Sequence, residues 1–300
     1  MSREFAAIAA IIAAVTSSPA VAQDEVQRLE PESAWYADYA EHSCGLRRLF
    51  GGEGKRVYLE LRQYTPRGGI IGTIASGDFR RRSNLRNLQI TFQPDTAPLE
   101  RVQPIQVSAD DIGEGILFNA WFADQQQRAR FLETQANDHQ AVMDQDILQS
   151  RETAIDSVRV DGLYIRDIEL RTGSLGPPMQ VMRDCLDNLQ SYWGFDPAVQ
   201  NSLSRPVRSF EMHEWSRALM RQYPRNLLNS GQQAYVRARV NVSADGTPTD
   251  CLAQTDFNNE AFNKLACDLL LEHGRFEPAL DAAGEPVDSY WATAVRYQIQ

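Results

Sequence analysis

Apolar and polar residues alternate along most of the first half of the chain. Within residues 56–64, Val57, Leu59 and Leu61 are separated by Tyr, Glu and Arg, which is the period of a strand with one buried face. Further stretches of this kind, bounded by Gly, Pro, Asn and Asp, lie at residues 68–75, 87–94, 101–109, 115–123 and 161–170. Many short strands at such spacing predict a mainly antiparallel, sandwich-like β domain with helices over residues 23–192.

Two segments interrupt this alternation and predict helices. Residues 124–147 break the period of two and are expected to be helical. A second helix is predicted to follow residues 173–178. Pro177 and Pro178 at the end of this segment suit a helix start. The apolar residues of this second helix that share one face are Met179, Met182, Leu186 and Leu189. Residues 193–214 contain Pro, Ser and Trp without a clear period, and they are interpreted as a linker.

The remaining segment, residues 215–300, predicts a small α+β domain. Its pattern reads as a short helix, a strand, a turn at Asp245 and Gly246, a second strand, a helix and a last strand. Asn258 or Asn259 can cap the longer helix, which ends at Gly274. The apolar stripe of that helix consists of Phe262, Leu265, Ala266, Leu269 and Leu270.

The last strand is a feature that needs an explanation. Its residues alternate, with Trp291, Thr293, Val295, Tyr297 and Ile299 on one face. Such a strand completes the core of a small domain with that face. It also offers an edge to which another chain can add a strand.

Four cysteines remain after the first 22 residues, and they allow three disulfide pairings. Cys251 ends a predicted strand and Cys267 lies in the following helix, so a bond between them would join helix to sheet. This placement favours the pairs Cys251–Cys267 and Cys44–Cys185. The other two pairings would link the two predicted domains.

The first residues predict export. A short apolar run at residues 6–15 precedes Ala20 and Ala22, the small residues that a signal-peptide cleavage site requires. The run is about half of the ~20 residues that cross a bilayer. We therefore expect residues 1–22 to be a signal peptide, cleaved near Ala22, and the mature protein to begin at Gln23 in the periplasm. An uncleaved membrane anchor is the alternative.

Charge and motifs exclude several classes of function. The net charge of −10 argues against a nucleic-acid surface, and the basic cluster at residues 80–86 reads as a solvated turn. No catalytic motif, metal-ligand spacing or cofactor fingerprint is present, so we expect no enzyme, no metal and no cofactor. His42 and Cys44 imitate a thiol–base pair, but Cys44 has a disulfide partner in the favoured pairing.

The final domain resembles the C-terminal domain of TonB proteins over about residues 215–300. The matching motifs, in the order of that family, are Gln222, Tyr223 and Pro224, then Gly231, residues 236–250, residues 274–279 and residues 284–287. The resemblance implies a periplasmic binding or adaptor protein that captures an extended peptide, such as a segment of an outer-membrane TonB-dependent transporter, by strand addition. Membrane contact would then occur only through partners.

The resemblance also implies which residues meet the partner. Gln222, Tyr223 and Pro224 would flank the incoming peptide, and the last strand would offer the backbone groups of Tyr290, Ala292, Ala294 and Arg296. Two alternatives stay open. One is a membrane-anchored energy transducer, with the N-terminal run retained. The other is an enzymatic or ligand-binding domain in residues 23–192, with the TonB-like part as a tether.

Overall fold

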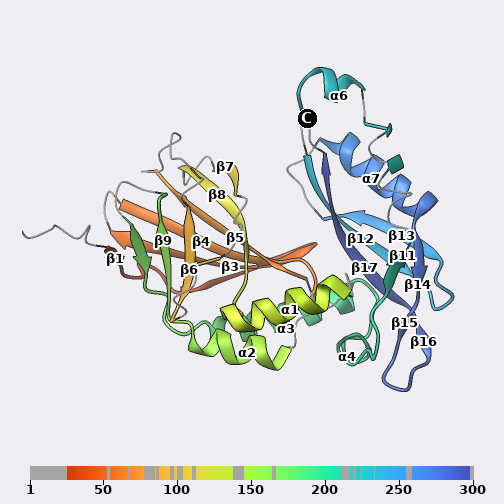
Figure 1. Ribbon diagram of the computed structural model, residues 1–300, viewed down its shortest axis with the longest axis horizontal. Helices are drawn as coiled ribbons and strands as arrows, with labels where there is room; N and C mark the ends of the chain where they lie inside the picture. Colours follow the sequence, from red (N-terminus) through yellow and green to blue (C-terminus); the bar gives the residue numbers. More distant parts are fainter. Residues whose placement is uncertain are drawn as a thin grey trace, which may run out of the picture.

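The structure is a computed structural model, and it falls into two parts that meet near helix α4 (Figure 1). The predicted signal peptide, Arg80–Arg82, Arg86, Pro224 and Ile299 lie outside the described residues. The described residues are 26–52, 55–66, 68–77, 85, 88–94, 98–99, 104–109, 113–137, 145–163, 167–210, 217–218, 221–223, 225–232, 234–254 and 259–297.

The larger part is built on a six-stranded antiparallel sheet, as the alternating pattern predicts. Neighbouring strands follow each other along the chain except at the edge, where β8 lies between β5 and β7. In spatial order the strands are β2 (Tyr36–Ala40), β3 (Ser43–Gly52), β4 (Lys55–Gln63), β5 (Ile70–Ser76), β8 (Gly113–Ala120) and β7 (Ile105–Ala109).

A second, four-stranded sheet faces the first. Its strands in spatial order are β1 (Gln27–Leu29), β10 (Ile168–Leu170), β9 (Ser157–Asp161) and β6 (Gln89–Gln93). The pairing of β1 with β10 is parallel, and the other pairings are antiparallel. The two sheets therefore form the sandwich-like arrangement expected from the sequence.

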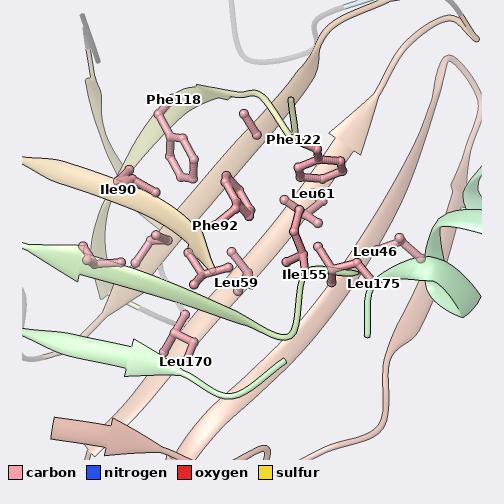
Figure 2. Close-up of a cluster of buried hydrophobic side chains, with 14 of the residues drawn as sticks. Leu46, Leu59, Leu61, Ile90, Phe92, Phe118, Phe122, Ile155, Leu170 and Leu175 are labelled. Atoms are coloured by element: carbon pink, nitrogen blue, oxygen red, sulfur yellow. The ribbon is translucent and has the colours of Figure 1, made fainter. Parts of the chain in front are cut away.

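The core of the sandwich lies between the two sheets. Figure 2 shows side chains from both sheets pointing into one apolar space, among them Leu59 and Leu61 from β4 and Ile90 and Phe92 from β6. These side chains are almost wholly buried. The period of two thus places one face of each strand in a shared core, and burial of that face stabilises the fold.

Three helices complete the larger part: α1 (Gln125–Asn137), α2 (Gln145–Ala154) and α3 (Gly176–Tyr192). The prediction of a helix at 124–147 is therefore wrong at its C-terminal boundary, because α2 continues past residue 147 to Ala154. Helix α3 starts at the predicted prolines and packs on β3. Its buried face contains the predicted residues Met179, Met182, Leu186 and Leu189.

The segment interpreted as a linker contains regular structure. Helix α4 (Pro197–Asn201) begins there, and the Asp196 side chain accepts a hydrogen bond from the Ala198 N–H as its N-cap. Strand β11 (Arg208–Phe210) follows and pairs with β14 (Arg275–Glu277) in the C-terminal part. A strand of three residues is too short to show a period, and its partner lies far along the chain.

The C-terminal part is an α+β unit with its own core. Its main sheet has the order β13–β12–β17, from β12 (Ala234–Val242), β13 (Pro248–Ala253) and β17 (Ser289–Tyr297). Helix α7 (Glu260–His273) packs on β12 and β13, and Asn259 caps its N-terminus as predicted. The helix stripe and the inner face of β12 together form an apolar cluster separate from that of the sandwich.

Smaller elements surround this sheet. Helix α6 (Arg225–Asn229) precedes β12, and Gly231 after it has a φ of 69°. This is the left-handed conformation that glycine favours at a helix end. Residues 279–287 contain a hairpin of β15 (Ala279–Leu280) and β16 (Pro286–Val287).

The structure contains both favoured disulfides. Cys44 of β3 is bonded to Cys185 of α3, and Cys251 of β13 is bonded to Cys267 of α7. Each bond joins a strand to the helix that covers its sheet. The sequence separations are 141 and 16 residues, so the two bonds constrain the unfolded chain to different extents.

Replacing Cys251 and Cys267 together by Ala is expected to lower the free energy of unfolding by about 3 kcal/mol, from loop entropy alone. The Cys44–Cys185 bond closes a longer loop, so the matched double variant C44A/C185A is expected to lower the free energy of unfolding by about 5 kcal/mol. Denaturant unfolding measures both values, and mass mapping without reductant checks the pairing. Free thiols at Cys251 and Cys267 in the wild type would contradict the assignment.

Candidate functional site

Strand β17 forms one edge of the C-terminal sheet. It pairs with β12 in continuous antiparallel register from Ser289 to Tyr297. Among the residues that the structure describes, no other strand pairs with it. Its outer row of main-chain donors and acceptors therefore has no strand partner within this part of the chain.

The register shows which residues of β17 form that row. The Gln254 N–H donates to the Arg237 carbonyl at 2.7 Å, so the backbone groups of Arg237 point toward β13. Because alternate residues of a strand point their backbone groups in opposite directions, those of Ala238 point toward its partner Thr293. The backbone groups of Ala294 consequently point away from β12. The same alternation applies to Tyr290, Ala292 and Arg296.

The two faces of β17 differ in burial. Val295 and Tyr297 belong to the apolar cluster under α7, as the sequence pattern predicts. On the opposite face, Ala292 and Ala294 are exposed and carry the smallest apolar side chains. A main-chain edge beside small side chains is accessible to another extended chain.

Tyr223 is partly buried and packs against the apolar cluster of the C-terminal unit. Its ring meets those of Phe262 and Tyr297 edge to face, at centroid distances of 5.5 and 5.6 Å. Its hydroxyl donates to the Gln232 carbonyl. Desolvation raises the pKa of both Tyr223 and Tyr297 above the ordinary value. Gln222, the residue before Tyr223, is exposed.

Tyr290, at the other end of the strand, lies against the end of α3. Its ring centroid is 5.5 Å from that of Trp193 and 5.4 Å from that of Phe195. Gln190 of α3 donates to the Tyr290 hydroxyl at 2.9 Å. The Tyr290 side chain thus contacts the chain's own larger part, whereas its backbone groups, which the sequence assigned to a partner, point away from β12.

The sequence did not identify the contact between the two parts. The Arg239 guanidinium lies 4.0 Å from the Trp193 ring centroid, and that of Arg237 lies 4.7 Å from the Tyr64 ring. Burial lowers the pKa of Arg239, and the charge of Asp250 opposes that shift. Alternation along β12 indicates which face carries both arginines, but no local pattern reveals what covers that face.

His42 and Cys44 do not form a thiol–base pair. Cys44 is bonded to Cys185, and all four cysteines of the chain are in disulfides. The His42 carbonyl accepts a hydrogen bond from the Gln254 side chain at 3.2 Å. This segment therefore belongs to the contact between the two parts.

Within the described ranges, no helix is both long and apolar enough to span a bilayer.

Replacing Tyr223 with Ala is expected to destabilise the C-terminal unit by about 2–3 kcal/mol, because the aromatic cluster loses its outer ring. Replacing it with Phe keeps the ring and removes only the hydrogen bond to Gln232, a loss of about 1 kcal/mol. Thermal and denaturant unfolding of the two variants separate the contributions. Equal stability of Y223A and the wild type would show that Tyr223 has no packing role.

Comparison with known families identifies the segment that carries this edge. The family model described as Gram-negative bacterial TonB protein C-terminal matches residues 220–299. No curated protein and no solved structure matches the chain. Domains of this family are typically periplasmic and interact with proteins such as outer-membrane transporters. Residues 220–299 of this chain therefore form a TonB C-terminal domain.

Proposed function

We propose that the chain is a periplasmic binding or adaptor protein that captures an extended segment of a protein partner by strand addition to β17. The segment pairs with the outward-facing backbone groups of Ala292, Ala294 and Arg296, and an outer-membrane transporter is the expected source. The observation that carries this proposal is the outer edge of β17, with which no other described strand pairs, within a TonB C-terminal domain.

The sequence of β17 supports use of this edge. Proteins usually protect an exposed edge strand by keeping it short or by adding Pro, Lys or a bulge. Strand β17 has nine residues, contains neither Pro nor Lys, and pairs with β12 without a register shift. Such an edge readily recruits other chains, so its retention fits a strand that serves to bind a partner.

Main-chain hydrogen bonds would supply affinity, and side chains would set the register. Guest residues that project on the outer face would lie beside Ala292 and Ala294, whose small side chains leave space for larger guest residues. Gln222 and Tyr223, with Pro224, would flank the guest from the start of the domain.

The connection between the two parts favours an adaptor over an energy transducer. A transducer needs a long stalk to cross the periplasm, whereas residues 197–210 here contain α4 and β11. The Arg205 N–H also donates to the Leu280 carbonyl, which fixes this segment to the C-terminal unit. Residues 197–210 are thus folded against their neighbours.

Replacing Ala294 with Pro is expected to weaken capture by about tenfold or more, because proline lacks the N–H that points to the guest. Isothermal titration with short synthetic peptides, copied from the periplasmic N-terminal segments of the host's outer-membrane transporters, measures the change. A294S keeps the N–H and is the matched control. Equal affinity of folded A294P and A294S would place the contact elsewhere.

A second control tests whether the guest binds as a strand. The tightest peptide is made in two versions, with backbone nitrogens methylated at either its odd or its even positions. One version should lose binding and the other should keep it, because only one set of N–H groups faces β17. Equal binding of both versions would exclude strand addition.

We also propose that export removes residues 1–22. Sequencing of the N-terminus of the protein purified from the periplasmic fraction is expected to begin at Gln23. A protein that starts at Met1 or Ser2 and sediments with the inner membrane would instead indicate the anchored form. Replacing Ala20 and Ala22 with Leu should block processing, since the cleavage site requires small residues there.

A further inference from the structure

The first residues of β17 are held by side chains from the larger part and from the segment that follows it. Gln200 of α4 donates to the Asp288 carbonyl at 3.0 Å and accepts from the Ser289 hydroxyl at 2.7 Å. Both Gln200 and Ser289 are almost fully buried, at 4% and 2% exposure. Gln190 and Trp193 contact the next residue, Tyr290.

These contacts hold three consecutive residues from outside the sheet, Asp288 through its carbonyl and Ser289 and Tyr290 through their side chains. Residues 288–290 lie at the point where β17 begins, opposite Asn241 and Val242 at the end of β12. The end of an edge strand with a single neighbour opens more readily than its middle, because fewer interactions hold it. A buried glutamine that satisfies two polar groups there opposes this opening.

The contact does not cover the part of the strand that would pair with a guest. Ala292 and Ala294 remain exposed although Tyr290 is packed against α3. The two apolar clusters also remain separate, so the contact joins the two parts through hydrogen bonds and ring contacts rather than through a shared core. The larger part therefore orders the beginning of β17 and leaves its edge accessible.

We infer that Gln200, with Gln190 and Trp193, positions β17 for strand capture, so that contacts at the start of the strand strengthen binding further along its edge, at Ala292 and Ala294. This inference rests on the function proposed above. An edge that is already extended loses less conformational freedom when a guest pairs with it, and that preorganisation raises affinity. Coupling between two equilibria is reciprocal, so a bound guest would also strengthen the contact between the parts.

The matched comparison is Gln200→Ala against Gln254→Ala in the full chain. Gln254 is also buried and also bridges the two parts, donating to the carbonyls of His42 and Tyr64 at 3.2 Å. It follows β13 instead of β17. Both variants remove a buried glutamine from the same contact, but only Q200A releases the start of β17.

Amide hydrogen exchange tests the positioning role without any ligand. In Q200A, the exchange rates of the Ser289 and Trp291 amides, which face β12, are expected to rise about tenfold, while those in α7 stay unchanged. In Q254A, the Ser289 and Trp291 amides should exchange as in the wild type. A uniform rise across the whole C-terminal unit in Q200A would mean general destabilisation and would overturn the inference, as would no rise at all.

Peptide titration tests the consequence for binding, with the tightest synthetic transporter peptide as the probe. The expected result is affinity about three- to tenfold weaker in Q200A and unchanged in Q254A. Unchanged or tighter binding in Q200A would overturn the inference. If the wild type binds the peptide and A294P does not, unchanged binding in Q200A would refute this inference alone and leave the proposed function intact.

Ser289→Ala provides a second variant in case Q200A does not fold. It removes only the hydroxyl that donates to the Gln200 side chain, and it leaves α4 unaltered. The same local rise in exchange and the same direction of affinity change are expected, with smaller size. Wild-type exchange at Ser289 and Trp291 together with wild-type affinity in S289A would count against the inference.

Discussion

The main-chain pairing of β12 with β17 is the interaction on which the proposed activity depends. It satisfies the backbone groups of alternate residues of β17 and directs the remaining groups outward. The direction is fixed by the bond from the Gln254 N–H to the Arg237 carbonyl, one strand further into the sheet. A shift of the register by one residue would turn Val295 and Tyr297 out of the core, so the apolar cluster under α7 maintains the orientation of the edge.

The two parts of the chain are stabilised independently and joined by a different kind of contact. Each has its own apolar cluster and its own disulfide between a strand and a helix. Between them lie arginines over aromatic rings and glutamines that bond to backbone carbonyls. Such contacts are directional, so they determine orientation more than they contribute burial.

Elements with a clear period were predictable from the sequence. The strand at 234–242, the helix at 260–273 with its Asn259 cap, and both disulfides follow from alternation, a capping residue and the placement of cysteines. Strand β11 was not predictable, because three residues show no period and their partner is β14, far along the chain. The packing of Tyr290 on Trp193 was also not predictable, because alternation assigns a residue to one face of a strand and does not say which other residue packs against that face.

The bond between Cys44 and Cys185 has a mechanical consequence for the edge. Cys185 lies about two helical turns before Trp193, so the end of α3 that touches β17 is covalently tied to the start of β3, the second strand of the large sheet. Tension on a guest paired with β17 would be transmitted through Tyr290 to α3 and, through the disulfide, to β3. The sandwich would then serve as the anchor of the captured strand.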